Sequence, residues 1–110
     1  MKELTVLEQI ILAAVHNLAG EAYGLAIRKK IGSLTGRRLM YGTLYNALDQ
    51  LHRKGFIRKI KAPPGTADGM SRGRVYYGLT PSGNAALKAA YELQSAIWGS
   101  IPDLIEGGET

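Results

Sequence analysis

Only two stretches of the chain favour extended backbone, and both lie between segments with helical periodicity. Residues 56–61 are β-prone at their apolar positions, and residues 74–80 alternate with the period of two that is typical of a strand. The stretch between them, 62–73, is rich in the proline and glycine that favour turns. The sequence therefore predicts one two-stranded hairpin with a long tip, whose inward side chains are Val75, Tyr77 and Leu79.

Three helices are predicted before this hairpin. The first begins with a Thr-x-x-Glu capping box at residues 5–8 and extends to about residue 18. A second, short helix over residues 22–32 carries its apolar side chains on one face, and a turn follows it. We expect Thr43 to cap the third helix and Gly55 to end it.

The third helix is predicted to have two different faces. Leucine and alanine recur at helical spacing on one face, which we expect to pack into the core: Leu44, Ala47, Leu48 and Leu51. The opposite face carries polar and aromatic side chains: Tyr45, Asn46, Asp49, Gln50 and Arg53. The sequence thus predicts a helix with one buried face and one face available to a partner.

The fourth and longest helix is predicted to follow the hairpin, because Thr80 supplies a capping hydroxyl and Pro81 suits the first helical position. It extends to about Trp98 and has more apolar surface than one small domain can cover. We therefore expect a partner chain to cover it. The predicted interface residues are Leu87, Ala90, Tyr91, Gln94, Ile97 and Trp98.

Positive charge is concentrated in the middle of the chain. The net charge is +5, but residues 22–80 hold twelve Lys or Arg and two acids, a local charge of +10. The flanking segments are acidic, with −2 over residues 1–21 and −3 over residues 81–110. A polyanion such as DNA is the natural partner of such a segment. The alternative is an ordinary solvated surface.

Several function classes have little support. The chain has no cysteine, which excludes disulfides and thiolate metal sites, and its longest uncharged run, residues 9–20, is shorter than the ~20 residues of a membrane span. His16 and His52 lie on separate predicted helices, and the acids show no metal-ligand spacing. We expect a cytoplasmic protein without cofactor, metal or catalytic activity.

The order helix, helix, helix, hairpin, helix is that of a winged helix, an α+β fold that is mainly α. Four stretches in succession resemble the PadR family of bacterial transcriptional regulators: residues 23–27 (Tyr-Gly-Leu-Ala-Ile), 42–48 (Gly-Thr-Leu-Tyr-Asn-Ala-Leu), 55–57 (Gly-Phe-Ile) and 73–83 (Gly-Arg-Val-Tyr-Tyr-Gly-Leu-Thr-Pro-Ser-Gly). The resemblance implies a homodimeric DNA-binding protein, commonly a repressor, of the short form with one C-terminal helix. The long hairpin tip departs from the family pattern.

These expectations assign roles to particular residues. The third helix is expected to contact duplex DNA through Thr43, Tyr45, Asn46, Gln50 and Arg53, with Tyr45 singled out by the resemblance. The hairpin is expected to contact phosphates through Lys59, Lys61, Arg72 and Arg74. The alternative for Tyr45 is packing into the core, and for Thr43 a cap alone.

We expect residues 1–80 to form the DNA-binding domain, residues 81–100 a dimerisation helix packed on it, and residues 101–110 a short, frayed acidic tail. Tyr91 and Trp98 are candidate contacts for a small planar aromatic effector, although interface packing explains them as well. Two other function classes stay open: a winged helix that binds an acidic protein, and a small-molecule sensor built around Trp98.

Overall fold

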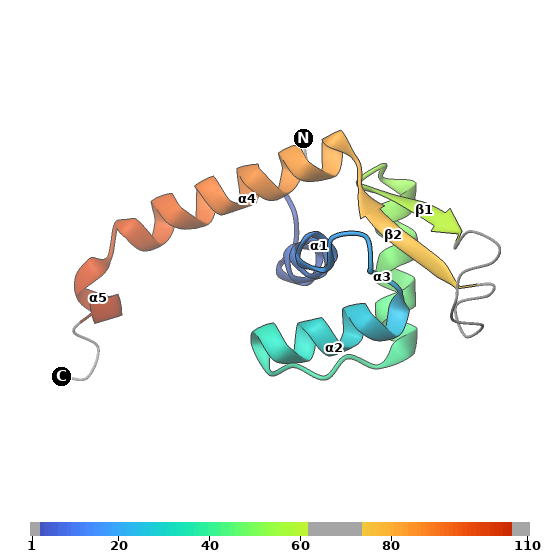
Figure 1. Cartoon of the computed structure of the whole chain (residues 1–110). Helices are drawn as coiled ribbons and strands as arrows, with labels where there is room; N and C mark the ends of the chain where they lie inside the picture. The colour runs from blue at the N-terminus through green and yellow to red at the C-terminus, as the bar shows by residue number, and fades with distance from the viewer. Residues whose placement is uncertain (1–2, 62–73, 107–110) are drawn as a thin grey trace.

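The computed structural model describes residues 3–61 and 74–106. Within this part of the chain three helices precede a two-stranded hairpin and two helices follow it (Figure 1). The elements are α1 (Val6–Leu18), α2 (Gly24–Thr35), α3 (Tyr41–Arg53), β1 (Ile57–Lys61), β2 (Val75–Leu79), α4 (Pro81–Gly99) and α5 (Pro102–Glu106). The predicted order is confirmed up to α4. The tail differs from the prediction, because residues 102–106 form the short helix α5 where a frayed segment was expected.

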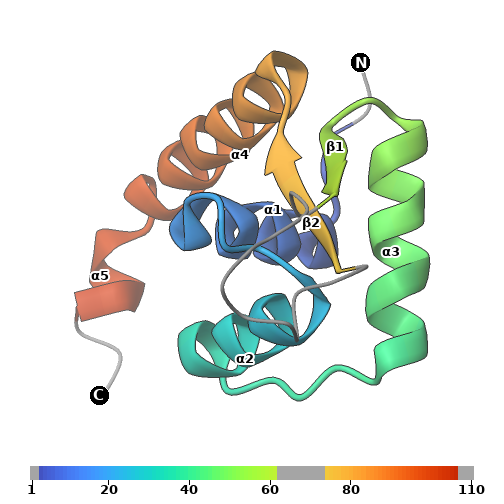
Figure 2. The ribbon, with the colours of Figure 1, turned by 45° about the vertical axis from the view of Figure 1, so that its right-hand side comes forward.

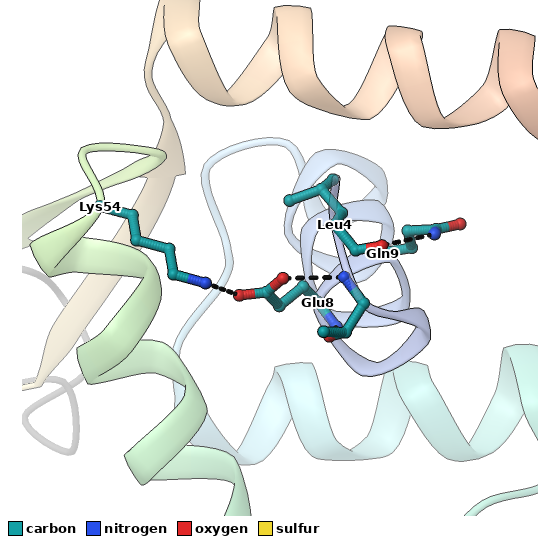
Figure 3. A network of polar contacts seen from close by, with 5 residues as sticks. Leu4, Glu8, Gln9 and Lys54 are labelled. Atoms are coloured by element: carbon teal, nitrogen blue, oxygen red, sulfur yellow. Dashed lines mark hydrogen bonds and ion pairs between the residues drawn. The ribbon is translucent and has the colours of Figure 1, made fainter. Parts of the chain in front are cut away.

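The predicted capping box of α1 is present. The Glu8 amide donates to the Thr5 hydroxyl at 3.1 Å, and the Thr5 amide donates to the Glu8 carboxylate at 2.9 Å. The other carboxylate oxygen of Glu8 accepts a hydrogen bond from the Lys54 ammonium, at the end of α3 (Figure 3). One carboxylate therefore caps α1 and also connects it to α3.

Burial of Glu8 by itself raises the pKa of its carboxyl group, because desolvation disfavours the charged form. The hydrogen bonds from Lys54 and Thr5, together with the positive charge of Lys54, outweigh burial, and the net effect lowers the pKa below its ordinary value. Folding thus favours the ionised carboxylate.

The third helix begins earlier than predicted. Its first residue is Tyr41 and its N-cap is Met40, which offers no side-chain cap, so the prediction that Thr43 caps the helix is wrong. The Leu44 amide donates to the Met40 carbonyl at 3.0 Å, which completes a helical turn before Thr43 could act as a cap. The helix therefore starts where the Tyr41 ring packs, and not at the hydroxyl cap that the local sequence favoured.

The core lies where the first three helices meet the hairpin. Its largest fully buried side chains come from all three helices and from β1: Ile11, Leu12, Ile27, Ile31, Leu44, Leu48, Leu51 and Ile57. In the antiparallel hairpin Ile57 pairs with Leu79 and Lys61 with Val75. Tyr77 of β2 is buried, and its amide donates to the Ala22 carbonyl at 2.7 Å. The hairpin is thereby attached to the segment that precedes α2.

The fourth helix starts at the predicted cap. The Thr80 hydroxyl accepts from the Gly83 amide at 3.0 Å and donates to the Gly55 carbonyl at 2.6 Å. The helix then crosses α1 and continues past the body of the molecule (Figure 1). Because of this projection, the structure is elongated, with principal extents of 56 × 31 × 23 Å.

Close packing at the start of α4 predicts a strong steric effect. A Cβ at Gly83 would lie 2.0 Å from the Phe56 carbonyl oxygen, whereas at Gly99, in the same helix, nothing lies within 4 Å. We expect Gly83→Ala to lower the free energy of unfolding by about 2 kcal/mol. Gly99→Ala should leave that free energy unchanged or raise it by up to about 1 kcal/mol. Urea denaturation of both variants measures the difference, and equal stabilities would contradict the packing described.

The Glu8–Lys54 ion pair predicts a pH-dependent stability. Because folding lowers the pKa of Glu8, the stabilisation is present at neutral pH and is lost as pH falls through the lowered pKa. Glu8→Gln keeps a capping-box side chain but removes the charge, and should cost about 1 kcal/mol at pH 7, since Lys54 is partly exposed. Well below about pH 4 the two proteins should have equal stability.

The matched control for this experiment is Asp49→Asn, which removes the exposed pair between Asp49 and Arg53, 3.0 Å apart. It should cost less than about 0.5 kcal/mol. A stability gap for Glu8→Gln that persisted unchanged at acid pH would contradict the assignment.

Candidate nucleic-acid interface

The two predicted faces of α3 are confirmed. Leu44, Ala47, Leu48 and Leu51 are buried. Along the opposite face Asn46, Gln50 and Arg53 are exposed, and Tyr45 keeps 47% of its surface exposed. Thr43 is also exposed, in the first turn. Figure 2 shows α3 along one side of the molecule, with α2 and the hairpin both packed on its inner side. The polar face is therefore open to a partner along the length of the helix.

Tyr45 lies across the start of α2, not in the core. Its hydroxyl occupies the space beside Gly24, where an added Cβ would lie 1.9 Å from the hydroxyl oxygen. The ring also stacks on Tyr41, one helical turn earlier, with centroids 6.3 Å apart and planes 20° apart. The absence of a side chain at Gly24 thus sets the orientation of Tyr45.

Two exposed residues at the start of α3 were not among the predicted contacts. Met40 is 75% and Tyr41 45% exposed, and the Tyr41 ring stacks on Tyr45. Met40 and Tyr41 lie before the predicted helix, which was expected to begin at its cap, Thr43. The i, i+4 spacing of Tyr41 and Tyr45 could have placed them on one helical face.

A groove of about 420 Å³ opens between the starts of α2 and α3 and strand β2. Its lining is mainly aromatic, with one cation: Tyr23, Gly24, Leu25, Tyr41, Tyr45, Arg74, Val75 and Tyr77. The Arg74 guanidinium lies 3.9 Å from the centroid of the Tyr23 ring. Burial raises the pKa of Tyr77, with added effects from Tyr45 and Asp49, so this phenol stays neutral. The groove combines hydroxyls with positive charge, which suits a sugar–phosphate backbone.

The hairpin contributes further cations beside α3. Lys59 and Lys61 of β1 are exposed as predicted, and so is Arg58, which the sequence pattern did not single out. Arg74 is partly buried over Tyr23. Arg72 lies outside the described residues. Arg53, at the end of α3, pairs with Asp49 while its side chain remains 70% exposed.

The predicted interface residues of α4 fall into two groups. Ala90 is buried and Leu87 packs against the core, so the chain itself covers both. Tyr91, Ile97 and Trp98 are exposed, by 70%, 45% and 51%. Gln94 is partly exposed, and its side-chain oxygen accepts from the Trp98 indole at 2.8 Å. Leu93 is exposed as well, so the apolar surface lies on the projecting half of α4.

The described part of the chain shows no group of three His, Asp or Glu side chains that could hold a metal ion. None of its helices combines the length and apolar character that a bilayer crossing requires.

Comparison with protein-family models identifies the family. A model of the PadR-like transcriptional regulator family matches residues 11–89, from within α1 to the middle of α4. The chain belongs to the PadR-like family. As a PadR-like regulator it is a DNA-binding protein that acts in transcription. Comparison with curated protein sequences gives no match.

Solved structures show the winged-helix fold for this PadR-like chain. RosR of H. salinarum is 27% identical, with a TM-score of 0.69 over 86% of this chain and 77% of RosR. A transcriptional regulator from Clostridium thermocellum is 24% identical, with a TM-score of 0.69 over 91% of this chain and 90% of its own. A mutant MarR from E. coli, complexed with operator DNA, is 21% identical, with a TM-score of 0.65 over 82% of this chain and 55% of MarR.

The placement of Tyr45 predicts that Gly24 controls DNA affinity from a buried position. Gly24→Ala would push the Tyr45 hydroxyl aside, and because the end of a side chain can move, stability should change little. We expect about tenfold weaker binding to the preferred duplex, the effect of losing one well-placed hydrogen bond. Fluorescence anisotropy with labelled DNA measures this.

The control is Gly32→Ala, in the same helix, where a Cβ would make an ordinary 3.6 Å contact with the Arg37 carbonyl. It should bind DNA as the unmodified protein does. Equal affinities for both variants would show that Tyr45 does not act on DNA from this position.

Proposed function

We propose that the protein is a repressor that binds an inverted-repeat operator as a homodimer. Each protomer places the start of α3 in a major groove, and the two helices enter successive grooves about 34–36 Å apart. The observation that carries the proposal is the polar face of α3, exposed beside the cationic strand β1. Repression follows when the bound dimer blocks access of the polymerase.

The chemistry of the exposed side chains divides the contacts into two kinds. The amides of Asn46 and Gln50 suit adenine edges, which offer one donor and one acceptor in the major groove. Hydroxyls and cations suit phosphates, which need charge and reach more than shape. We assign phosphate contacts to Thr43, Arg53, Lys59, Lys61 and Arg74, together with Arg72 in the segment outside the described residues. The Tyr45 hydroxyl, which can both donate and accept, is assigned to a base edge.

The homodimer is supported by the projecting half of α4. Leu93, Ile97 and Trp98 expose apolar surface there, and Leu104 and Ile105 continue it on α5. A hollow of about 120 Å³ between α1 and α4 can take a side chain of a second copy. A two-fold dimer through this surface would carry two α3 helices on one side, as an inverted repeat requires. We propose residues 1–80 as the DNA-binding domain and residues 81–100 as the dimerisation helix.

The test of the function is selection of bound sequences from a random duplex pool, followed by titration of the selected duplex at several salt concentrations. We expect an inverted repeat, bound at least ~10³-fold more tightly than random DNA, with a log–log salt slope near −0.9 per phosphate contacted. Binding without sequence preference would reject a specific regulator and would favour the alternative of a winged helix that binds an acidic protein. The proposal places the protein in the cytoplasm with its operator.

The proposed dimer predicts that charge at the α4 surface separates the protomers. Ile97→Glu would bury a carboxylate in the interface, and light scattering should then report the mass of a monomer. Lys88 is exposed and, nine residues before Ile97, lies two and a half turns away on the opposite face of α4, so Lys88→Glu is the matched control and should leave a dimer. Identical masses for the two variants would contradict the proposed interface.

A planar aromatic effector is the second candidate role, supported by the exposure of Tyr91 and Trp98. Trp98 is the only tryptophan, so binding beside it should quench the indole fluorescence. If micromolar planar aromatics quenched Trp98 and the protein bound DNA only weakly, the chain would be a small-molecule sensor. If nothing quenched it, Trp98 would serve interface packing alone.

A further inference from the structure

Arg28 of α2 connects two parts of the molecule that the sequence keeps apart. Its Nε donates to the Leu39 carbonyl at 2.6 Å, in the segment that leads into α3. Its guanidinium carbon lies 4.5 Å from the centroid of the Tyr41 ring, at the first residue of α3. One side chain thus holds both the entry to α3 and the aromatic ring at its first position.

The contacts of Arg28 extend through Tyr41 to Tyr45, the residue that we propose contacts DNA. Tyr41 stacks on Tyr45, and Tyr45 lies against Gly24. Gly24 and Arg28 are one turn apart on α2, so both ends of this row of side chains rest on the same helix. We call Arg28, Tyr41 and Tyr45 the aromatic row.

The aromatic row stands where α3 lacks a cap. Met40 gives no side-chain hydrogen bond to the first turn. No acidic residue lies in that turn to interact with the positive end of the helix dipole. The first turn is nevertheless the part of α3 that a winged helix presents to base edges. Side chains from α2 therefore supply the order that capping would otherwise provide.

We propose that Arg28 is a positioning residue for sequence recognition: it fixes Tyr41 and Tyr45 before DNA arrives and does not itself contact a phosphate. The inference rests on the proposed function. Ordering side chains in advance strengthens binding, because less conformational freedom is lost in the complex. A planar guanidinium can stack on a ring and donate sideways at once, which an ammonium group does less well.

The next residue on α2, Lys29, differs from Arg28 in its exposure and contacts. Arg28 is partly buried and its guanidinium is engaged by Leu39 and Tyr41. Lys29 is exposed, on the same helix. Arg28 should therefore affect which sequence is bound, whereas Lys29 should affect only the general attraction to DNA.

The test compares Arg28→Lys, which keeps the charge, with Lys29→Gln, which removes one. For Arg28→Lys we expect about tenfold weaker binding to the selected operator, from the loss of one cation–π contact and one hydrogen bond. Affinity for random duplex and the salt slope should stay as in the unmodified protein. Lys29→Gln should change both affinities in parallel and keep their ratio.

A double-mutant cycle shows whether Arg28 acts through Tyr41. Tyr41→Leu combined with Arg28→Lys should bind the operator no more weakly than the weaker single variant. Additive losses would overturn the inference. So would a parallel fall of the affinities for the operator and for random duplex, because Arg28 would then be a phosphate contact.

Hydrogen exchange on the DNA-free protein separates this inference from the proposed function. Arg28→Lys should speed exchange of the first hydrogen-bonded amides of α3, those of Leu44 and Tyr45, while the amides of α1 stay protected and show that the fold is intact. Unchanged exchange rates at the start of α3 would contradict the inference that Arg28 orders the aromatic row. If exchange rose but the unmodified protein showed no sequence preference, the proposed function would fail, and with it the role of Arg28 in recognition.

Discussion

Burial of the leucine face of α3 is the constraint on which the rest of the structure depends. Leu44, Leu48 and Leu51 are almost fully excluded from solvent. A helix can bury only one face against α1, α2 and β1, so this burial fixes its rotation and leaves Asn46 and Gln50 outside (Figure 2). The hydrophobic effect that forms the core therefore also selects the side chains that we propose contact DNA.

The neighbouring elements hold α3 at both ends. At its start, the Tyr45 ring rests on Gly24 and Arg28 holds Tyr41. At its end, Lys54 binds Glu8, the capping residue of α1. The same end is tied to α4, because the Gly55 carbonyl accepts from the Thr80 hydroxyl. A shift of α4 at a dimer interface would thus reach α3 through a short chain of direct contacts, which is the physical requirement for an effector to alter DNA binding.

Much of the fold could be predicted from the sequence, because local patterns and tertiary packing agree over most of the chain. The capping box at Thr5, the cap at Thr80 and the apolar period of α3 each pointed to the element that forms. The start of α3 could not be predicted in this way, since Thr43 is a better local cap than Met40. Packing of Tyr41 against α2 decides it, and that contact joins residues distant in sequence.

The candidate site shows the same division. The periodicity of α3 placed Tyr45 and Gln50 on its open face, as observed. It could not show that Arg28 differs from Lys29, because both are cations on one helix, and the contacts of Arg28 with Leu39 and Tyr41 are visible only in the structure. In α4 the pattern treated Ala90 and Trp98 alike, whereas α1 covers the first half of the helix and not the second. The type of a side chain indicates which interactions it can make. Whether that side chain is exposed depends on how far the neighbouring helices and strands extend.

The central claim is that α3 enters the major groove. Methylation interference on the selected duplex tests it most directly, because methyl groups at guanine N7 lie in the major groove and those at adenine N3 lie in the minor groove. The account predicts interference at guanine N7 in two blocks about one helical turn apart, 10–10.5 base pairs, on one face of the DNA. Interference confined to adenine N3, or a single block, would contradict it.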